Sequence, residues 1–200
     1  MELQSIFTDI YKKNFWGSDE SRSGPGSTIE ETAPIRAALE ALMVELGIKS
    51  LLDLPCGDHN WMSQVNLHGV KYLGLDICQD VIDENNIRWA NLNREFKWGD
   101  ITKEIPQMDL VLVRDCLVHL PIDQIFTALN LIKESKSKWL LTTSFTGNIT
   151  NVDICAGDWR PLALTLPPFN FPEPVKIIDE THFHKKLMLW SVNDIPNCKF

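Results

Sequence analysis

The stretch LLDLPCGD, residues 51–58, decides how the chain folds, because it runs an apolar segment directly into a glycine turn with an acid on each side. Such an apolar run is typical of a buried strand. Glycine turns that follow strands often bind phosphate groups through backbone N–H groups. Asp53 and Asp58 would repel a phosphate, so we expect a neutral or cationic group at this turn.

Downstream of this turn, apolar strands alternate with helical patterns. We expect strands at 49–54, 70–77, 95–101, 108–115 and 137–144, and helices at 29–47, 60–67, 79–93 and 121–135. The order strand, helix, strand at this spacing predicts a parallel sheet with helices on its faces. Two further strands, at 175–180 and 185–192, are joined by a short connection, which predicts an antiparallel pair.

Composition limits the class of protein. The chain has 200 residues, of which 44% are hydrophobic, and this fits one globular domain with a sizeable core. A net charge of −8 disfavours a broad nucleic-acid surface. We find no apolar run of about 18 residues and no signal-peptide pattern, so we expect no membrane span. The five scattered cysteines form no CxxC pair, which favours a reducing cytoplasm over a disulfide framework or zinc finger.

Two irregular segments interrupt the pattern. Residues 18–28 are rich in Ser, Gly and charge, and they form either a linker or a binding loop. Residues 146–174 hold five prolines and no helical period, and their Phe and Trp residues argue against disorder. We therefore divide the single domain, 1–200, into four parts: an N-terminal cap segment and helix (1–47), a cofactor-binding core (48–145), a lid loop (146–174) and a C-terminal hairpin (175–200).

Four acids follow four successive strands of the expected sheet. They are Asp53, Asp76, Asp100 and Asp115. A single Asp in this position is usually a helix cap or a turn former. Because open α/β sheets bind ligands at the carboxyl ends of their strands, four in succession predict a binding site.

The chemistry of these acids points to a class of ligand. Asp76 can accept hydrogen bonds from both ribose hydroxyls of an adenosine, and Asp100 can accept one from the adenine amine. Asp53 and Asp58, on either side of Gly57, would suit an ammonium group. A nucleoside that carries positive charge and no phosphate fits all of these positions, and S-adenosylmethionine is such a molecule.

The motifs also resemble those of a known family. The stretches SLLDLPCGDHNWM, YLGLDI, FKWGDIT and MDLVLVRDCLVHLP resemble, in that order, the successive motifs of class I S-adenosylmethionine-dependent methyltransferases. FWGSDESRSGPGST, RDCLVHLP and GDWRPLALTLPPFNFPEP are similar to one bacterial branch, often associated with glycan or surface-polysaccharide modification. The resemblance covers nearly the whole chain. It implies an α/β, Rossmann-like, mostly parallel sheet of seven strands with helices on both faces, an antiparallel last strand, and S-adenosylmethionine as the cofactor.

The resemblance also implies which residues contact the cofactor. The candidate set is Asp53, Pro55, Cys56, Gly57, Asp58, Trp61, Asp76, Ile77, Gly99, Asp100, Ile101, Arg114, Asp115 and Leu117. This chain departs from the general pattern, because its usual three-glycine turn is reduced to Gly57. Pro55 can fix the turn in place of the missing glycines.

His119 and Asp115 are the candidate catalytic residues. His119 lies close to the point where a methyl group would be delivered, and an imidazole suits proton removal at neutral pH. The alternative is that His119 only anchors the following helix. Asp115 is the competing base, unless it contacts the ammonium group of the cofactor. His182 and His184 could share a metal ion, but two histidines in a hairpin turn are more typically solvated, and we expect no metal.

Four residues of the irregular segments are candidates for acceptor binding: Trp16, Arg22, Trp159 and Arg160. An Arg beside a Trp can hold a carboxylate, a phosphate or a sugar. The alternative is that the tryptophans only seal loops over the core.

The sequence favours methyl transfer to a small-molecule or glycan-linked acceptor, at oxygen. A methyltransferase acting on protein or RNA and a catalytically inactive cofactor-binding module remain alternatives. A nicotinamide-dependent oxidoreductase would require a GxGxxG turn, which this chain lacks.

Overall fold

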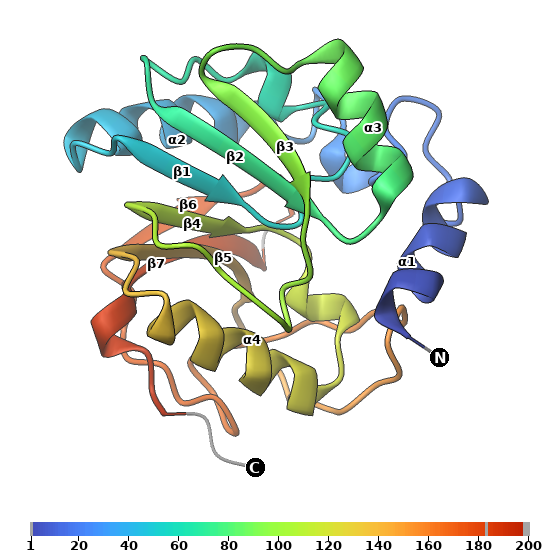
Figure 1. Ribbon diagram of the computed structural model, residues 1–200. Coiled ribbons are helices and arrows are strands. Elements are labelled where there is room, and N and C mark those ends of the chain that lie inside the picture. The colour runs from blue at the N-terminus through green and yellow to red at the C-terminus, as the bar shows by residue number, and fades with distance from the viewer. Residues whose placement is uncertain (1, 183, 198–200) are drawn as a thin grey trace.

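The computed structural model describes residues 2–182 and 184–197 as one seven-stranded sheet with helices around it (Figure 1). The strands are β1 (Ser50–Asp53), β2 (Lys71–Asp76), β3 (Arg94–Trp98), β4 (Leu110–Val113), β5 (Trp139–Phe145), β6 (Lys176–Asp179) and β7 (Lys185–Ser191). Their order across the sheet is β3-β2-β1-β4-β5-β7-β6. The first five strands are parallel, and β7 lies antiparallel between β5 and β6. This confirms the predicted mostly parallel, Rossmann-like sheet with its antiparallel last strand.

Helices cover both faces of the sheet. The α-helices are α1 (Leu3–Lys12), α2 (Ala33–Glu45), α3 (Gln79–Arg88) and α4 (Ile122–Glu134), and the 3₁₀ turns are η1 (Pro25–Ser27), η2 (Met62–Gln64), η3 (Leu117–His119) and η4 (Val192–Asp194). On one face, α4 packs its buried Ile125 and Leu129 against the sheet. On the other, α2 and α3 contribute Leu39 and Ile82 to a second core. Alternate residues of the strands supply both cores, as a strand buried on two sides requires.

Helix α1 was not expected from the sequence. It lies beyond the carboxyl ends of the parallel strands (Figure 1). Its apolar residues recur at helical spacing on one face: Leu3, Ile6, Phe7, Ile10 and Tyr11. Because that face looks toward the ends of the strands and not toward either core, α1 covers the edge of the sheet at which ligands bind in this class of fold.

Three helices are shorter than expected, and one of them, α3, ends at Arg88 instead of at residue 93. The segment 60–67 forms only η2, because Val65 and Leu67 are both buried, and a spacing of two does not keep both on one face of a helix. The helix expected at 29–47 begins at Ala33, after a turn in which the Thr32 hydroxyl donates to the Thr28 carbonyl. Gly47, with φ +62°, follows the end of α2, as predicted.

The long loop 146–174 is ordered by core contacts. Leu162 and Leu164 are fully buried. Phe169 packs edge-on against Phe126 of α4, with ring centroids 5.5 Å apart, and Phe171 packs in the same way against Trp190 of β7. The aromatic residues that argued against disorder therefore serve mainly to fix the loop to the core.

Candidate active site

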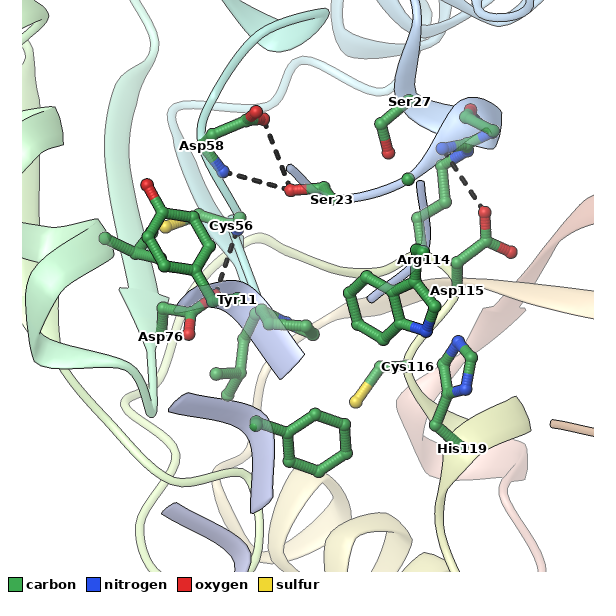
Figure 2. Close-up of a pocket in the computed structure, with 18 of the residues that line it drawn as sticks. Tyr11, Ser23, Ser27, Cys56, Asp58, Asp76, Arg114, Asp115, Cys116 and His119 are labelled. Atoms are coloured by element: carbon green, nitrogen blue, oxygen red, sulfur yellow. Dashed lines mark hydrogen bonds and ion pairs between the residues drawn. The ribbon is translucent and has the colours of Figure 1, made fainter. Parts of the chain in front are cut away.

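A cavity of about 820 Å³ lies at the carboxyl ends of the parallel strands (Figure 2). The turn after β1 and the ends of β2, β3 and β4 form its floor. Leu3, Phe7 and Tyr11 of α1 close one side, and residues 22–27 close another. Small-molecule sites typically enclose about 300–1,000 Å³, so this cavity is large enough for a nucleoside and a second small molecule.

The turn after β1 has no backbone donors to offer a phosphate. The N–H of Cys56 donates to the carbonyl oxygen of Leu75 at 2.8 Å. The N–H of Gly57 donates to Oδ2 of Asp76 at 3.1 Å, and that of Asp58 donates to Oγ of Ser23 at 3.1 Å. Since a dinucleotide site needs such N–H groups for the pyrophosphate, this turn does not suit one.

Asp76 faces the cavity from the end of β2 and is held firmly. Besides the bond from Gly57, its Oδ1 accepts the N–H of Cys78 at 2.9 Å. Burial raises the pKa of Asp76 to about 6, and these backbone N–H groups oppose the rise. A carboxylate fixed in this way can accept further hydrogen bonds from a diol in the cavity.

Asp53 and Asp100 line the cavity on either side of Asp76. Oδ2 of Asp53 accepts the Tyr72 hydroxyl at 2.7 Å. Burial raises the pKa of Asp53 to about 7, and the bond from Tyr72 acts in the opposite direction. Oδ1 of Asp100 accepts the N–H and the hydroxyl of Thr102, which fixes the side chain in the cavity wall.

Asp58 holds the segment 18–28 in place. Its carboxylate accepts the Ser21 hydroxyl at 2.9 Å, the Arg22 N–H at 2.8 Å and the Ser23 hydroxyl at 3.2 Å. Gly57 is needed here, because a Cβ at this position would lie 2.2 Å from the Ser23 hydroxyl. The segment therefore packs directly on the glycine turn, and Asp58 serves as its anchor.

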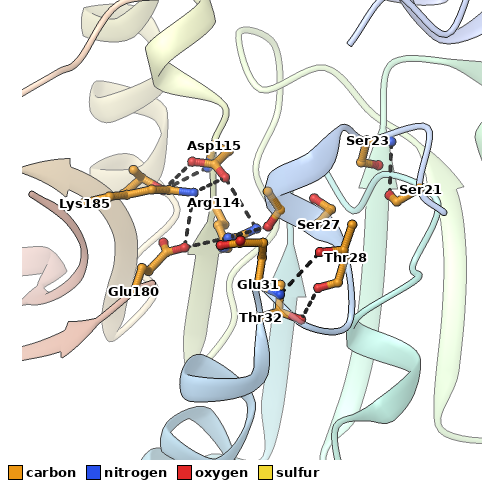
Figure 3. Close-up of polar contacts among 12 residues, drawn as sticks. Ser21, Ser23, Ser27, Thr28, Glu31, Thr32, Arg114, Asp115, Glu180 and Lys185 are labelled. Atoms are coloured by element: carbon orange, nitrogen blue, oxygen red, sulfur yellow. Dashed lines mark hydrogen bonds and ion pairs between the residues drawn. The ribbon is translucent and has the colours of Figure 1, made fainter. Parts of the chain in front are cut away.

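A cluster of four charges closes the other side of the cavity (Figure 3). Arg114 donates to Oε2 of Glu180 at 2.5 Å and to the carbonyl oxygen of Gly26 at 2.8 Å. Lys185 bonds Oδ2 of Asp115 at 2.5 Å and lies 3.1 Å from Oε2 of Glu180. Because the two positive and two negative charges balance, the cluster can be buried.

This cluster changes the role open to Asp115. Burial raises the pKa of the carboxyl, but Arg114 and Lys185 outweigh that effect, and the net pKa lies below its usual range. A carboxylate with a lowered pKa is a weak base, so Asp115 suits an electrostatic role better than proton removal.

His119 stands in η3 with one ring nitrogen committed. Its Nδ1 lies 2.9 Å from the carbonyl oxygen of Asp158, and a carbonyl can only accept, so Nδ1 carries the proton. The ring packs on Trp16, with centroids 5.1 Å apart. Burial lowers the pKa of His119, partly offset by the bond to Asp158. The neutral ring thus presents the lone pair of Nε2, the arrangement that a general base requires.

Three of the four expected acceptor residues line the cavity: Trp16, Arg22 and Trp159. Trp159 packs edge-on against Phe145, and Arg22 stacks over the Tyr11 ring at 5.4 Å. Arg160 differs from the expectation. Its guanidinium is buried and donates to the carbonyl oxygens of Leu117, Leu120 and Val152, so it fixes the long loop and lies outside the cavity wall.

The cofactor residues expected from the sequence lie together, with one exception. Those in the cavity wall are Asp53, Pro55, Cys56, Gly57, Asp58, Trp61, Asp76, Ile77, Gly99, Asp100, Ile101, Arg114 and Asp115. Leu117 instead points into the core beneath η3.

Sequence reasoning missed α1, Ser23, Glu180 and Lys185. The helical spacing of apolar residues in α1 and the position of Glu180 directly after β6 were the signals available. Among residues 2–182 and 184–197, no three His, Cys, Asp or Glu side chains are grouped so as to hold a metal ion. No helix in that part of the chain is long and apolar enough to cross a membrane.

No protein-family model matches the sequence, and no curated protein matches it. Solved structures do resemble it. The structure of Burkholderia thailandensis 1,6-didemethyltoxoflavin-N1-methyltransferase, with bound 1,6-didemethyltoxoflavin and S-adenosylhomocysteine, matches with a TM-score of 0.64 at 17% identity, over 94% of this chain and 86% of that one. Magnesium protoporphyrin IX methyltransferase from Synechocystis PCC 6803, with S-adenosylhomocysteine, gives a TM-score of 0.59 at 12% identity, over 94% of this chain and 95% of that one. This chain therefore has the fold of these methyltransferases.

Proposed function

We propose that this protein transfers the methyl group of S-adenosylmethionine to an oxygen atom of a small-molecule acceptor. One observation carries the proposal. At the ligand-binding edge of a methyltransferase-like sheet, the glycine turn has committed its N–H groups, and acids surround it. Such a site rejects a pyrophosphate and accepts a nucleoside that carries positive charge.

The residues in the cavity fit the parts of this cofactor. Asp76 would accept the two ribose hydroxyls, and Asp100 would accept the exocyclic amine of adenine. Asp53 would face the ammonium group. The apolar side chains of Ile77 and Ile101 line the same region and suit an adenine ring.

The cofactor, when bound, supplies a methyl group on a sulfonium ion. The protein would contribute mainly by aligning the acceptor with that methyl group and by keeping water out. Nε2 of His119 would take the proton from the acceptor hydroxyl, a smaller contribution. Helix α1 and the segment 18–28 would cover the reacting groups.

The shape and lining of the cavity favour a small molecule over a polymer. Trp16, Phe145 and Trp159 provide flat apolar surfaces near His119, and such surfaces pack well on a sugar or another ring. A protein or RNA substrate would have to enter a cavity that α1 and residues 22–27 close on two sides. Sugars, free or glycan-linked, are therefore the acceptors that we would test first.

Calorimetry with S-adenosylhomocysteine and with NAD tests the cofactor assignment. We expect the wild type to bind S-adenosylhomocysteine and not NAD. Asp76→Ala should weaken binding by about 1–3 kcal/mol, because the ribose hydroxyls lose their acceptor. Binding of NAD alone, or unchanged affinity in the folded variant, would contradict the assignment. Incubating the protein and labelled S-adenosylmethionine with an extract of the source cells would then reveal the acceptor, and absence of any labelled product would favour an inactive binding module.

A further inference from the structure

Behind Asp53, two buried side chains continue away from the cavity. The hydroxyl of Tyr72 on β2 lies 2.7 Å from Oδ2 of Asp53 and 3.1 Å from Nδ1 of His59. All three side chains are at most 3% exposed. Of the three residues, only Asp53 lines the cavity.

The proton positions in this chain follow from its chemistry. A tyrosine hydroxyl has one hydrogen, and an ionised carboxylate can only accept, so Tyr72 donates to Asp53. The Tyr72 oxygen then accepts from His59, which must carry its proton on Nδ1. Burial lowers the pKa of His59 to about 3, so the ring is neutral and donates through one nitrogen only.

His59 is held in this orientation at a cost. Its backbone has φ +58°, a conformation that residues other than glycine rarely adopt. Phe96 packs edge-on against its ring at 4.9 Å, and Trp89 lies at 5.9 Å. Within the described part of the chain, its Nε2 is buried without a hydrogen-bond partner. Backbone strain and unpaired buried nitrogen atoms are uncommon in proteins, and backbone strain clusters at functional sites, where the surrounding residues hold the strained group in place.

We propose that Tyr72, oriented by His59, is a positioning residue that favours the anionic form of the Asp53 carboxylate at the cavity wall and thereby raises the affinity for a ligand amine. The inference rests on the proposed function, because it takes the ammonium group of the cofactor as the partner of Asp53. Tyr72 and His59 lie behind Asp53, outside the cavity lining, and would act on the ligand only through Asp53.

The surroundings of Asp53 explain why it needs such support. Burial and the neighbouring charge of Asp76 raise the pKa of the carboxyl, whereas Tyr72 and the more distant Arg114 lower it. The Cys56 thiol, in the adjoining turn, is neutral because burial raises its pKa well above the usual value. Of the opposing groups, Tyr72 is the one in direct contact with Asp53.

The Tyr72→Phe substitution tests the proposal, since it removes one hydroxyl and leaves the ring. In the ligand-free protein, the ¹³Cγ signal of Asp53, assigned with Asp53→Asn, should titrate at a pH about one unit higher in the variant. The affinity for S-adenosylhomocysteine should fall about fivefold near pH 7, and the ratio of the two dissociation constants should shrink toward pH 9. His59→Phe, which keeps Tyr72 but removes its donor, should shift the midpoint in the same direction by less.

Tyr11→Phe is the matched control. Tyr11 is the other tyrosine of the chain, and its hydroxyl interacts with Glu84 on α3. This variant should leave the Asp53 midpoint in place. In an Asp53→Asn background, Tyr72→Phe should no longer alter the pH dependence of binding. An unchanged midpoint in both Tyr72→Phe and His59→Phe would overturn the proposal. If the wild type fails to bind S-adenosylhomocysteine at any pH, the proposed function fails, while the ¹³C titration still decides the role of Tyr72.

Discussion

The His119 imidazole donates from Nδ1 to the backbone carbonyl oxygen of Asp158 at 2.9 Å, and this bond leaves Nε2 as the ring's acceptor. A second hydrogen bond joins η3 to the same long loop: the N–H of Gly157 donates to the carbonyl oxygen of His119. His119 is thus an anchor whose Nε2 stays available for the base role of the proposed function, so the two roles suggested by the sequence do not exclude each other. They can be separated by substitution.

His119→Asn should separate them. The asparagine amide can still donate to Asp158, but it has no basic nitrogen. If His119 is the base, methyl transfer should fall about a hundredfold or more, with S-adenosylhomocysteine affinity within about twofold of wild type. The rate would be followed with labelled S-adenosylmethionine and the acceptor fraction of the cell extract. A variant that keeps its full rate would leave His119 only the anchoring role.

Gly57→Ala tests how closely the segment 18–28 packs on the glycine turn. A Cβ there would meet the Ser23 hydroxyl at 2.2 Å, and φ is +52°. We expect it to weaken S-adenosylhomocysteine binding and to speed hydrogen exchange at residues 21–23. Gly47→Ala is the matched control, because φ is +62° and no atom lies within 4 Å of the added Cβ. That variant should lose only about 1 kcal/mol of unfolding free energy. Equal effects of the two substitutions would show that backbone conformation, and not the contact with Ser23, governs Gly57.

The sheet could be predicted from the sequence because its strands are continuous apolar runs that end in turns. Leu51, Leu52, Leu110 and Val111 are all fully buried. A short apolar run bounded by turns is typical of such a buried strand. The acids at the strand ends were also predictable, because parallel strands bring their carboxyl ends to one edge.

The pairings between distant side chains could not be read from the sequence. Asp58 looked like a ligand-binding acid, yet its partners are Ser21, Arg22 and Ser23, more than thirty residues away. Arg160 looked like an acceptor residue, yet its planar fork matches three backbone carbonyls. In the sequence, a charged side chain that binds a ligand cannot be told from one that bonds another part of the chain. Only the three-dimensional arrangement of its neighbours distinguishes the two roles.

Arg160→Ala should therefore destabilise the protein without directly altering the cavity. It leaves the carbonyl oxygens of Leu117, Leu120 and Val152 without their donor, at a cost of about 2–4 kcal/mol of unfolding free energy. Arg160→Lys should recover little of this, because an ammonium group lacks the fork geometry. Urea denaturation would measure both. If Arg160→Ala keeps wild-type stability but impairs methyl transfer, Arg160 contributes to acceptor binding and not to stability.

The pH dependence of stability offers a last test of the buried groups. The folded pKa of Asp53 is about 7, against about 4 for an unfolded Asp, so the folded state binds a proton more tightly. Stability contributed by this group therefore decreases as pH rises from about 4 to about 7. His59 acts in the opposite direction, because its folded pKa of about 3 lies below the unfolded value of about 6.5, and its contribution decreases as pH falls below about 6.5.

Because Asp53 and His59 change the unfolding free energy in opposite directions with pH, their effects partly cancel in the wild type. Single substitutions should reveal each effect separately. Relative to wild type, Asp53→Asn should gain about 3 kcal/mol of unfolding free energy between about pH 4 and about pH 7, since asparagine does not titrate. His59→Phe should change in the reverse sense, gaining stability relative to wild type as the pH falls below about 6.5. Urea denaturation of the ligand-free proteins at about four pH values in this range would measure both differences. If the difference between Asp53→Asn and wild type does not vary with pH, Asp53 titrates as it does in the unfolded chain, and its burial beside Tyr72 has no electrostatic consequence.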